Sequence, residues 1–411
     1  MVQYHYQDKK ATAMINDKTI SPKKNKTIAF VFPSLMASFK NEILMGMAHY
    51  AQKRRNISIK CIEDYHVEEK DIFAGCDGIF MAVSDEKSVA RMVATGLPIV
   101  RHYDYPKRPD MIDIAFDDRK IGTMAAEWFL RRGFKNFAYC GSHGSIDSDE
   151  VEKAFASTVA KAGFKCLVFE KPGAIKSRKY KHSLNVLVRS LDKWIPTLPQ
   201  HTAVLCMHDF RASHFLYACM RHGRAVPNDI AIMGQYNDVA FCACTPVTIT
   251  SVDVNPRAFG EAAMRILDNA IDNPVEPKLR QTFFVPPVGI VERESTAVYP
   301  VNPPWLAKCL LMLDANLDKS ISAADLAKSA GVSQTMLQKA FHKAFGTTAG
   351  KYITSVKMRE AKRLLDENQL NVKEVALRTG FSSPQYFSHA YHDFYGRAPV
   401  SDKLAGNSTK A

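Results

Sequence analysis

A pattern that occurs twice near the C-terminal end constrains this chain more than any other feature. Gly331 in the first copy and Gly380 in the second are separated by 49 positions, whereas Gly346 and Gly396 farther along are separated by 50. The second copy therefore has one additional residue in its middle, and the pattern keeps its register on either side. Two copies in register indicate that this end of the chain folds as two similar units.

Each copy predicts a short helix, a turn and a second helix. Ser322 and Asp325 have the spacing of a capping box, in which a polar side chain and an acid three residues later satisfy free backbone amides. Gly331 ends that short helix, because glycine readily adopts the left-handed conformation favoured there, and Ser333 is placed to start the next helix. The corresponding residues of the second copy are Asn371, Glu374, Gly380 and Ser383, which is followed by Pro384.

The second helix of each copy is expected to have one apolar and one polar face. In the first copy Leu337, Phe341 and Phe345 recur every four residues and should pack inward. The polar side chains on the other face are Gln334, Thr335, Gln338, Lys339 and His342. This arrangement is typical of DNA-binding helix-turn-helix units. A chance repeat of an αα-hairpin and a protein-binding helical bundle are the alternatives, and a basic helix around residues 357–363 favours DNA.

The C-terminal stretch also resembles the DNA-binding domain of AraC/XylS-type transcription regulators. The resemblance extends from about Ser320 to Pro399 and includes 359–365 (Arg-Glu-Ala-Lys-Arg-Leu-Leu), 375–382 and 394–399. It implies two recognition helices that enter successive major grooves, about 34 Å apart. The residues that it places toward the bases are Gln334, Thr335, Gln338 and Lys339 in the first helix, and Pro384, Gln385, Ser388 and His389 in the second. Phosphate contacts are expected from Lys343, Lys351, Lys357 and Arg397.

Length and charge agree with a DNA-binding protein of several domains. The chain has 411 residues, enough for two or three domains, and a formal net charge of +13. A basic terminal domain indicates a polyanionic partner. We expect a flexible tail over residues 1–25, either inert or touching DNA, an effector-binding domain over 26–302 and the DNA-binding domain over 303–411.

Cysteine usage and hydropathy predict a cytoplasmic protein. The nine cysteines are scattered and form no Cys-x-x-Cys motif, which is typical of small core residues in a reducing compartment. No apolar run approaches the roughly 18 residues of a membrane span, and residues 1–25 lack the apolar segment of a signal peptide. We therefore expect no contact with a membrane.

The middle of the chain alternates between predicted strands and helices. Strands are expected at 27–32, 57–62, 77–83, 98–100, 113–116, 136–140, 166–169, 203–207 and 230–233, and helices at 40–55, 88–94, 121–132, 150–162, 181–191 and 212–222. Such alternation implies parallel sheets with right-handed crossovers. The new start at Asn136 implies two α/β lobes rather than one large sheet, and segments 249–252, 256–271 and 281–285 are expected to return to the first lobe.

The middle resembles the periplasmic-binding-protein-like effector domain of LacI/GalR regulators, in the form that precedes AraC-type ends in xylose-operon regulators. The matching stretches are 33–35, 117–126, 132–141, 226–231, 250–253 and 285–290. This resemblance implies two lobes that close on a monosaccharide, most plausibly a pentose such as xylose, at the carboxyl ends of the strands. It further implies a homodimer that binds an operator in double-stranded DNA and works with RNA polymerase, without a cofactor or metal.

Candidate sugar-binding residues lie on the predicted strand-end loops. A sugar site needs planar polar side chains for paired hydroxyls and an aromatic face for the ring. The candidates are Ser34, Phe39, Arg101, Tyr103, Asp117, Asp149, His208, Asp209, Arg211, Asn237 and Asp238. Two places depart from the family pattern: His208 stands where asparagine is usual, and either Tyr236 or Asn237 replaces an aspartate that grips sugar hydroxyls.

No catalytic motif competes with this interpretation. The sequence has no Gly-x-Gly-x-x-Gly after a strand, no P-loop, and neither a Gly-x-Ser-x-Gly nor a His-Glu-x-x-His motif. The predicted function is therefore a non-enzymatic, sugar-responsive transcription regulator. The alternative is a sugar- or nucleotide-processing α/β enzyme with a DNA-binding appendage, which turnover of a candidate sugar would reveal.

Overall fold

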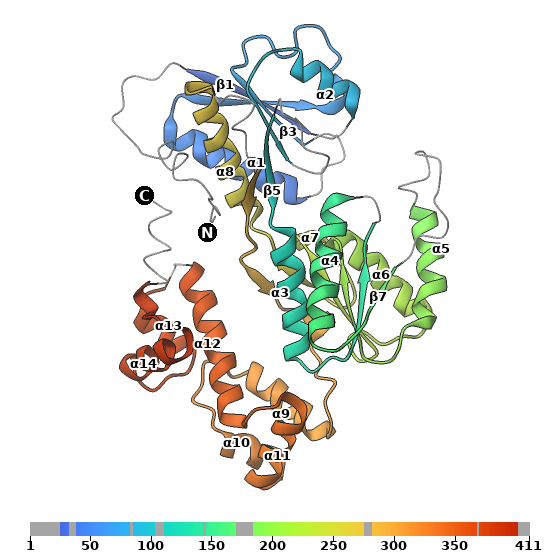
Figure 1. Cartoon of the computed structure of the whole chain (residues 1–411), viewed down its shortest axis with the longest axis vertical. Coiled ribbons are helices and arrows are strands. Elements are labelled where there is room, and N and C mark those ends of the chain that lie inside the picture. Colours follow the sequence, from blue (N-terminus) through green and yellow to red (C-terminus); the bar gives the residue numbers. More distant parts are fainter. Residues whose placement is uncertain are drawn as a thin grey trace.

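The computed structural model describes residues 25–32, 38–82, 85–102, 111–142, 145–169, 184–274, 282–367 and 370–401. Nearly all of the expected tail over 1–25 lies outside these ranges, and so do Ser34, Tyr103 and the side chain of Phe39. Figure 1 shows two α/β lobes, blue and green, followed by a separate group of orange and red helices. The predicted fold class, a two-lobed α/β part followed by an all-α part, is confirmed.

The first lobe is built on a parallel sheet, which in the described residues has the strand order β11-β5-β4-β3-β1-β2. Its interior strand β1 is apolar, as a strand covered on both faces must be, and Ile28 to Val31 are at most 1% exposed. The strands are β1 (Lys26–Phe32), β2 (Ile57–Glu63), β3 (Gly78–Met81), β4 (Ile99–His102), β5 (Ile112–Phe116) and β11 (Thr282–Val285). The helices are α1 (Ser38–Arg54), α2 (Glu86–Val93), α8 (Pro256–Asp272) and the short 3-10 helix Asp64–His66.

The second lobe repeats this plan with the order β12-β10-β9-β8-β6-β7 among the described strands. Its strands run parallel except β12, which pairs antiparallel with β10. The strands are β6 (Asn136–Cys140), β7 (Cys166–Val168), β8 (Thr202–Cys206), β9 (Ile230–Gln235), β10 (Thr250–Asp253) and β12 (Gly289–Val291). The helices are α3 (Asp118–Arg131), α4 (Ile146–Lys161), α5 (Leu184–Trp194), α6 (Asp209–Arg221) and α7 (Val239–Ala243), with 3-10 turns at Ile195–Thr197 and Glu294–Thr296.

One strand lies in a different lobe from the one expected. The prediction that residues 249–252 return to the first lobe is wrong, because β10 pairs with β9 in the second sheet. The return is made by α8 and β11, as predicted for 256–271 and 281–285. α8 lies so close to α1 that a Cβ on Gly260 would be 1.9 Å from the carbonyl oxygen of Ile43. This close approach anchors the returning helix in the first lobe.

The carboxyl ends of strands from the two sheets meet between the lobes. Phe116 ends β5 in the first lobe, and Tyr236 directly follows β9 in the second. Their ring centroids are 5.7 Å apart, and the ring of Phe259 from α8 packs on Phe116 at 4.5 Å. The strand-end loops that carry the sugar-binding candidates therefore belong to edges that face one another.

The C-terminal helices form two units that share one long helix. The helices are α9 (Pro304–Asp314), α10 (Ala323–Ser329), α11 (Gln334–Phe345), α12 (Ala349–Glu367), α13 (Val372–Arg378) and α14 (Pro384–Tyr395). One apolar core joins α9, α10, α11 and the start of α12, and a second joins the end of α12 to α13 and α14. Both predicted capping boxes are present, Ser322 with Asp325 and Asn371 with Glu374. The predicted double helix-turn-helix arrangement is thus confirmed. No helix in the described part of the chain is long and apolar enough to span a membrane.

Candidate functional site

The candidate DNA-reading helices α11 and α14 expose the polar faces predicted for them. In α11 the buried side is formed by Leu337 and Phe341, and in α14 by Phe387 and Tyr391, all four at 0% exposure. The predicted contact residues that are exposed are Gln334, Thr335, Lys339, Lys343, Lys351, Gln385, His389 and Arg397. Pro384 and Ser388 are half-buried. Apolar anchoring of one face is what leaves the opposite face available to a groove.

Two of the predicted base readers also make contacts within the protein. The side-chain oxygen of Gln338 accepts a hydrogen bond of 3.0 Å from the backbone amide of Ala349, at the first residue of α12. The side-chain oxygen of Gln338 is therefore engaged at a helix N-terminus. The Ser388 hydroxyl donates to the carbonyl of Pro384 at 2.8 Å, one turn earlier in the same helix.

Lys357 was expected to contact phosphate, and the structure contradicts this expectation. The residue is only 5% exposed, and its ammonium donates hydrogen bonds to the carbonyls of Lys319 at 2.7 Å and Gly380 at 3.0 Å. It therefore joins the loop before the first helix-turn-helix unit to the turn of the second. Burial lowers the pKa of Lys357. The sequence showed only a basic residue on a helix, which is equally typical of a solvated face.

In the first lobe, the buried side chain of Arg101 forms an ion pair with an aspartate of the neighbouring strand. Its side chain is 4% exposed, and its Nη2 lies 2.8 Å from Oδ1 of Asp113. The two residues face each other because β4 and β5 are adjacent and pair Arg101 with Asp113. Asp117 is half-buried and caps α3, accepting a hydrogen bond of 3.0 Å from the amide of Lys120. Sheet order, which the sequence does not give, decided the pairing of Arg101.

In the second lobe, Asn237 is held in a defined orientation at the end of β9. Its backbone is left-handed, with φ 51°, and its backbone N–H donates a hydrogen bond of 3.0 Å to the hydroxyl of Ser251. The side chain accepts a hydrogen bond of 2.7 Å from Arg293 and donates one of 3.2 Å to Asp253. Tyr236 also has a positive φ, 87°, and directs its ring to Phe116 of the first lobe. Sequence reasoning missed Arg293, because it reaches Asn237 only through the antiparallel pairing of β12 with β10.

Asp209 and Asp238 lie within the second lobe, beneath its strand-end surface. Asp209 is 1% exposed, and its Oδ2 accepts a hydrogen bond of 2.7 Å from the backbone amide of Asp238. Asp238 in turn caps α7 through the amides of Ala240 and Phe241. Burial raises the pKa of Asp209 to about 7. Both carboxylates thus shape the loops that follow β8 and β9.

Three buried polar atoms at these strand ends have no hydrogen-bond partner in the described part of the chain. They are Oδ1 of Asp209, Oδ2 of Asp238 and Nε of Arg211. Buried polar atoms are normally paired, so these three are the atoms that a bound water or polar ligand would satisfy. Arg211 also donates to the carbonyl of Gly141 at 3.2 Å, and Asp149 is half-buried on α4.

His208 acts as the N-cap of α6. Its Nδ1 accepts a hydrogen bond of 2.9 Å from the backbone amide of Arg211, which requires a neutral ring. Burial, followed by the positive charge of Arg211, lowers the pKa of His208 to about 4. The usual asparagine at this position would cap the same amide without a titrating group.

We expect His208→Asn to make the protein less sensitive to acid. Because the pKa of His208 is lower in the folded than in the unfolded chain, its stabilising effect is present above about pH 6.5 and is lost as the pH falls toward 4. Between pH 8 and pH 5 the free energy of unfolding of the wild type should fall by about 2 kcal/mol more than that of the variant. Urea unfolding of both proteins at pH 8 and pH 5 measures this, and an equal loss in both would show that His208 is not held neutral.

Among the described residues, no group of three or more histidine, cysteine, aspartate or glutamate side chains is placed to hold a metal ion. The sites assembled here consist of hydrogen-bonding groups at strand ends and of exposed polar side chains on α11 and α14.

Comparison with known proteins places both parts of the chain. Residues 126–296 match a family model described as a periplasmic binding protein-like domain, and residues 326–401 match a helix-turn-helix domain. The xylose operon regulatory protein of Escherichia coli (strain K12) is 25% identical over 386 residues, which cover 92% of this chain and 96% of that protein. The xylose operon regulatory protein of Haemophilus influenzae is 22% identical, with 89% and 95% covered.

A solved structure has the same overall arrangement. The structure of the xylose-binding transcription activator xylR matches with a TM-score of 0.56 and 24% identity, and the match covers 93% of this chain and 98% of that one. A similarity at this level of identity supports the fold. The structural match extends along almost the full length of both proteins, as the sequence matches to the xylose operon regulatory proteins do. This chain therefore contains a periplasmic binding protein-like domain followed by a helix-turn-helix domain, and it is similar along almost its full length to xylose operon regulatory proteins.

Proposed function

We propose that this protein is a DNA-binding transcription regulator that senses a monosaccharide, a pentose such as xylose, and controls genes of sugar catabolism. The observation that carries the proposal is the combination of two helix-turn-helix units, each with an exposed polar face, and a two-lobed α/β part with facing strand ends. The relatives named for xylose regulation align with this chain along almost their full length.

The proposed sugar site lies at the strand ends of the second lobe, opposite Phe116. Asn237 offers an oriented amide, and the unpaired atoms of Asp209, Arg211 and Asp238 offer further donors and acceptors. Amide and carboxylate groups recognise paired hydroxyls, and an aromatic ring such as that of Tyr236 can cover the apolar face of a sugar. Of the first-lobe candidates, Asp117 remains in the proposal, whereas Arg101 supports the sheet.

Sugar binding would shift the protein between conformations. A ligand that contacts both lobes favours the closed state only to the extent that it binds that state more tightly. We propose domain limits of 26–302 for sensing and 303–411 for DNA binding, action in the cytoplasm as a homodimer, and contact with RNA polymerase. Relatives that regulate transcription support a non-enzymatic role.

A thermal-unfolding panel tests the sensing half. The full-length protein is heated with D-xylose, other pentoses, hexoses or uronic acids, and each mixture is also assayed for consumption of the sugar. A saturable rise in melting temperature with one pentose and no product is expected. Product formation would favour an α/β enzyme, and no stabilisation by any sugar would contradict sugar sensing.

The phosphate-contacting role of Lys343 has its own test. Lys343 is exposed near the C-terminal end of α11. We expect Lys343→Ala to weaken binding to every DNA sequence and to reduce the slope of log K against log salt by about one unit. Titrations at several salt concentrations measure the slope, with exposed Glu374→Gln as a control that removes no positive charge. An unchanged slope would remove Lys343 from the phosphate contacts.

A further inference from the structure

The α/β part and the helical part meet around one buried guanidinium. Arg132 follows the last residue of α3, and its side chain is 7% exposed. The guanidinium lies 4.2 Å from the ring centroid of Trp128 and 4.6 Å from that of Tyr299. It also forms ion pairs with Glu292 and with Asp314, whose Oδ2 is 3.3 Å away. A charge buried to this degree is stable only while such partners remain in place.

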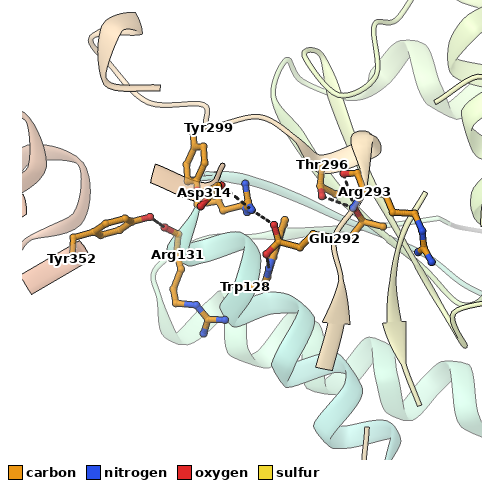
Figure 2. A network of polar contacts seen from close by, with 10 residues as sticks. Trp128, Arg131, Glu292, Arg293, Thr296, Tyr299, Asp314 and Tyr352 are labelled. Carbon is orange, nitrogen blue, oxygen red and sulfur yellow. Dashed lines mark hydrogen bonds and ion pairs between the residues drawn. The ribbon is translucent and has the colours of Figure 1, made fainter. Parts of the chain in front are cut away.

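These partners belong to different parts of the molecule. Trp128 and Glu292 lie in the second lobe, where the indole nitrogen of Trp128 donates to Glu292 at 3.0 Å. Asp314 ends α9, and Tyr299, which packs in the core of the first helix-turn-helix unit, donates to it at 2.9 Å. Figure 2 shows Tyr299 and Asp314 beside Glu292 and Trp128, so that the two sets of partners converge on one place.

Two connections run from the second-lobe partners of Arg132 to the proposed sugar site, one through the residue after Glu292 and one through helix α3. Glu292 is followed by Arg293, which donates hydrogen bonds to the side chain of Asn237 at 2.7 Å and to the carbonyl of Ile249 at 2.8 Å. α3, which carries Trp128 and ends next to Arg132, begins at its cap Asp117. Glu292 and Trp128, which contact Arg132, are therefore both linked to residues proposed to contact the sugar.

We propose that Arg132 is an interdomain latch that couples sugar occupancy to the placement of the DNA-binding helices. This inference rests on the proposed sugar-sensing function. A sugar that forms hydrogen bonds with the side chain of Asn237 displaces Arg293 from it, and the neighbouring Glu292 moves with Arg293. Closure of the lobes moves α3 relative to the strand ends. Either movement changes the distance between Arg132 and Asp314. Burial raises the pKa of Asp314, so the charged form of its carboxylate depends on this cation.

Variants of the full-length protein test the latch. Asp314→Asn keeps an acceptor for Tyr299 but removes the charge paired with Arg132. Asp192→Asn is the matched control, because it removes the same charge from an ion pair within the second lobe, where Nη2 of Arg221 lies 2.7 Å from Oδ1 of Asp192. Both variants change one charge, but only the first changes the latch.

The first readout is the ratio of DNA affinities with and without saturating D-xylose, measured on a duplex selected from a random pool by wild type. Couplings of this kind are typically about 5- to 150-fold. We expect Asp314→Asn to bring the ratio at least fivefold closer to one, and Asp192→Asn to keep the wild-type ratio. Because the coupling is reciprocal, the ratio of xylose affinities with and without DNA should change by the same factor in Asp314→Asn. A wild-type ratio in Asp314→Asn would overturn the latch.

The second readout does not require a sugar. Limited proteolysis of the segment 297–303, between the two parts, should be at least fivefold faster in Asp314→Asn than in wild type and unchanged in Asp192→Asn. If wild type binds DNA but no sugar changes its affinity, the sensing proposal fails, and this rate still decides whether the latch holds the two parts together. Equal cleavage rates in all three proteins would sink the latch.

Discussion

Gly380→Ala is expected to destabilise the second helix-turn-helix unit by about 3 kcal/mol or more. Gly380 has φ +64°, a left-handed conformation that costs roughly 1–2 kcal/mol with any Cβ present. The added Cβ would also lie 2.2 Å from the carbonyl oxygen of Lys319 and 2.7 Å from Nζ of Lys357. A backbone carbonyl cannot rotate away as a side chain does, so the turn must move and the buried hydrogen bonds of Lys357 are strained.

The chain contains its own control for this prediction. Gly331 occupies the corresponding turn of the first copy with φ +65°, and nothing lies within 4 Å of a Cβ built there. Gly331→Ala should therefore cost only the left-handed strain, roughly 1–2 kcal/mol. Urea unfolding followed by circular dichroism measures both free energies. Equal losses would show that the approach of Lys319 to Gly380 does not stabilise the fold.

The second large effect is expected on DNA recognition when Lys339 and Gln385 are both replaced by alanine. The two side chains are exposed on α11 and α14, which resemble recognition helices for successive major grooves. Each direct base contact is worth roughly 1–3 kcal/mol, and contacts in separate grooves add. The double variant should therefore lose roughly 30-fold or more in affinity for cognate DNA, and much less for scrambled DNA.

Competition titrations on cognate and scrambled duplexes measure this loss of preference. Lys351→Ala, an exposed lysine in the first turn of α12, is the matched control, because a phosphate contact lowers both affinities together. Equal weakening on both duplexes in the Lys339→Ala/Gln385→Ala protein would show that these residues do not read bases.

The sequence alone determined the features that depend on neighbours in the chain. The two capping boxes, the positive φ at Gly331 and Gly380 and the apolar faces of α11 and α14 follow from residues three or four positions apart. The alternation of strands and helices likewise predicted parallel sheets, because a helix between two strands returns the chain so that the second strand runs parallel to the first. Local rules of this kind are read directly from spacing.

Only the tertiary structure decided which distant residues meet. It placed β10 in the second sheet, paired Arg101 with Asp113, buried Lys357 between two carbonyls and brought Asp314 to Arg132, 182 positions away. A charged side chain on a helix or at a strand end has the same appearance in the sequence whether it faces water, a ligand or a buried partner. Its role depends on sheet order and domain packing, which bring together groups that no spacing along the chain connects.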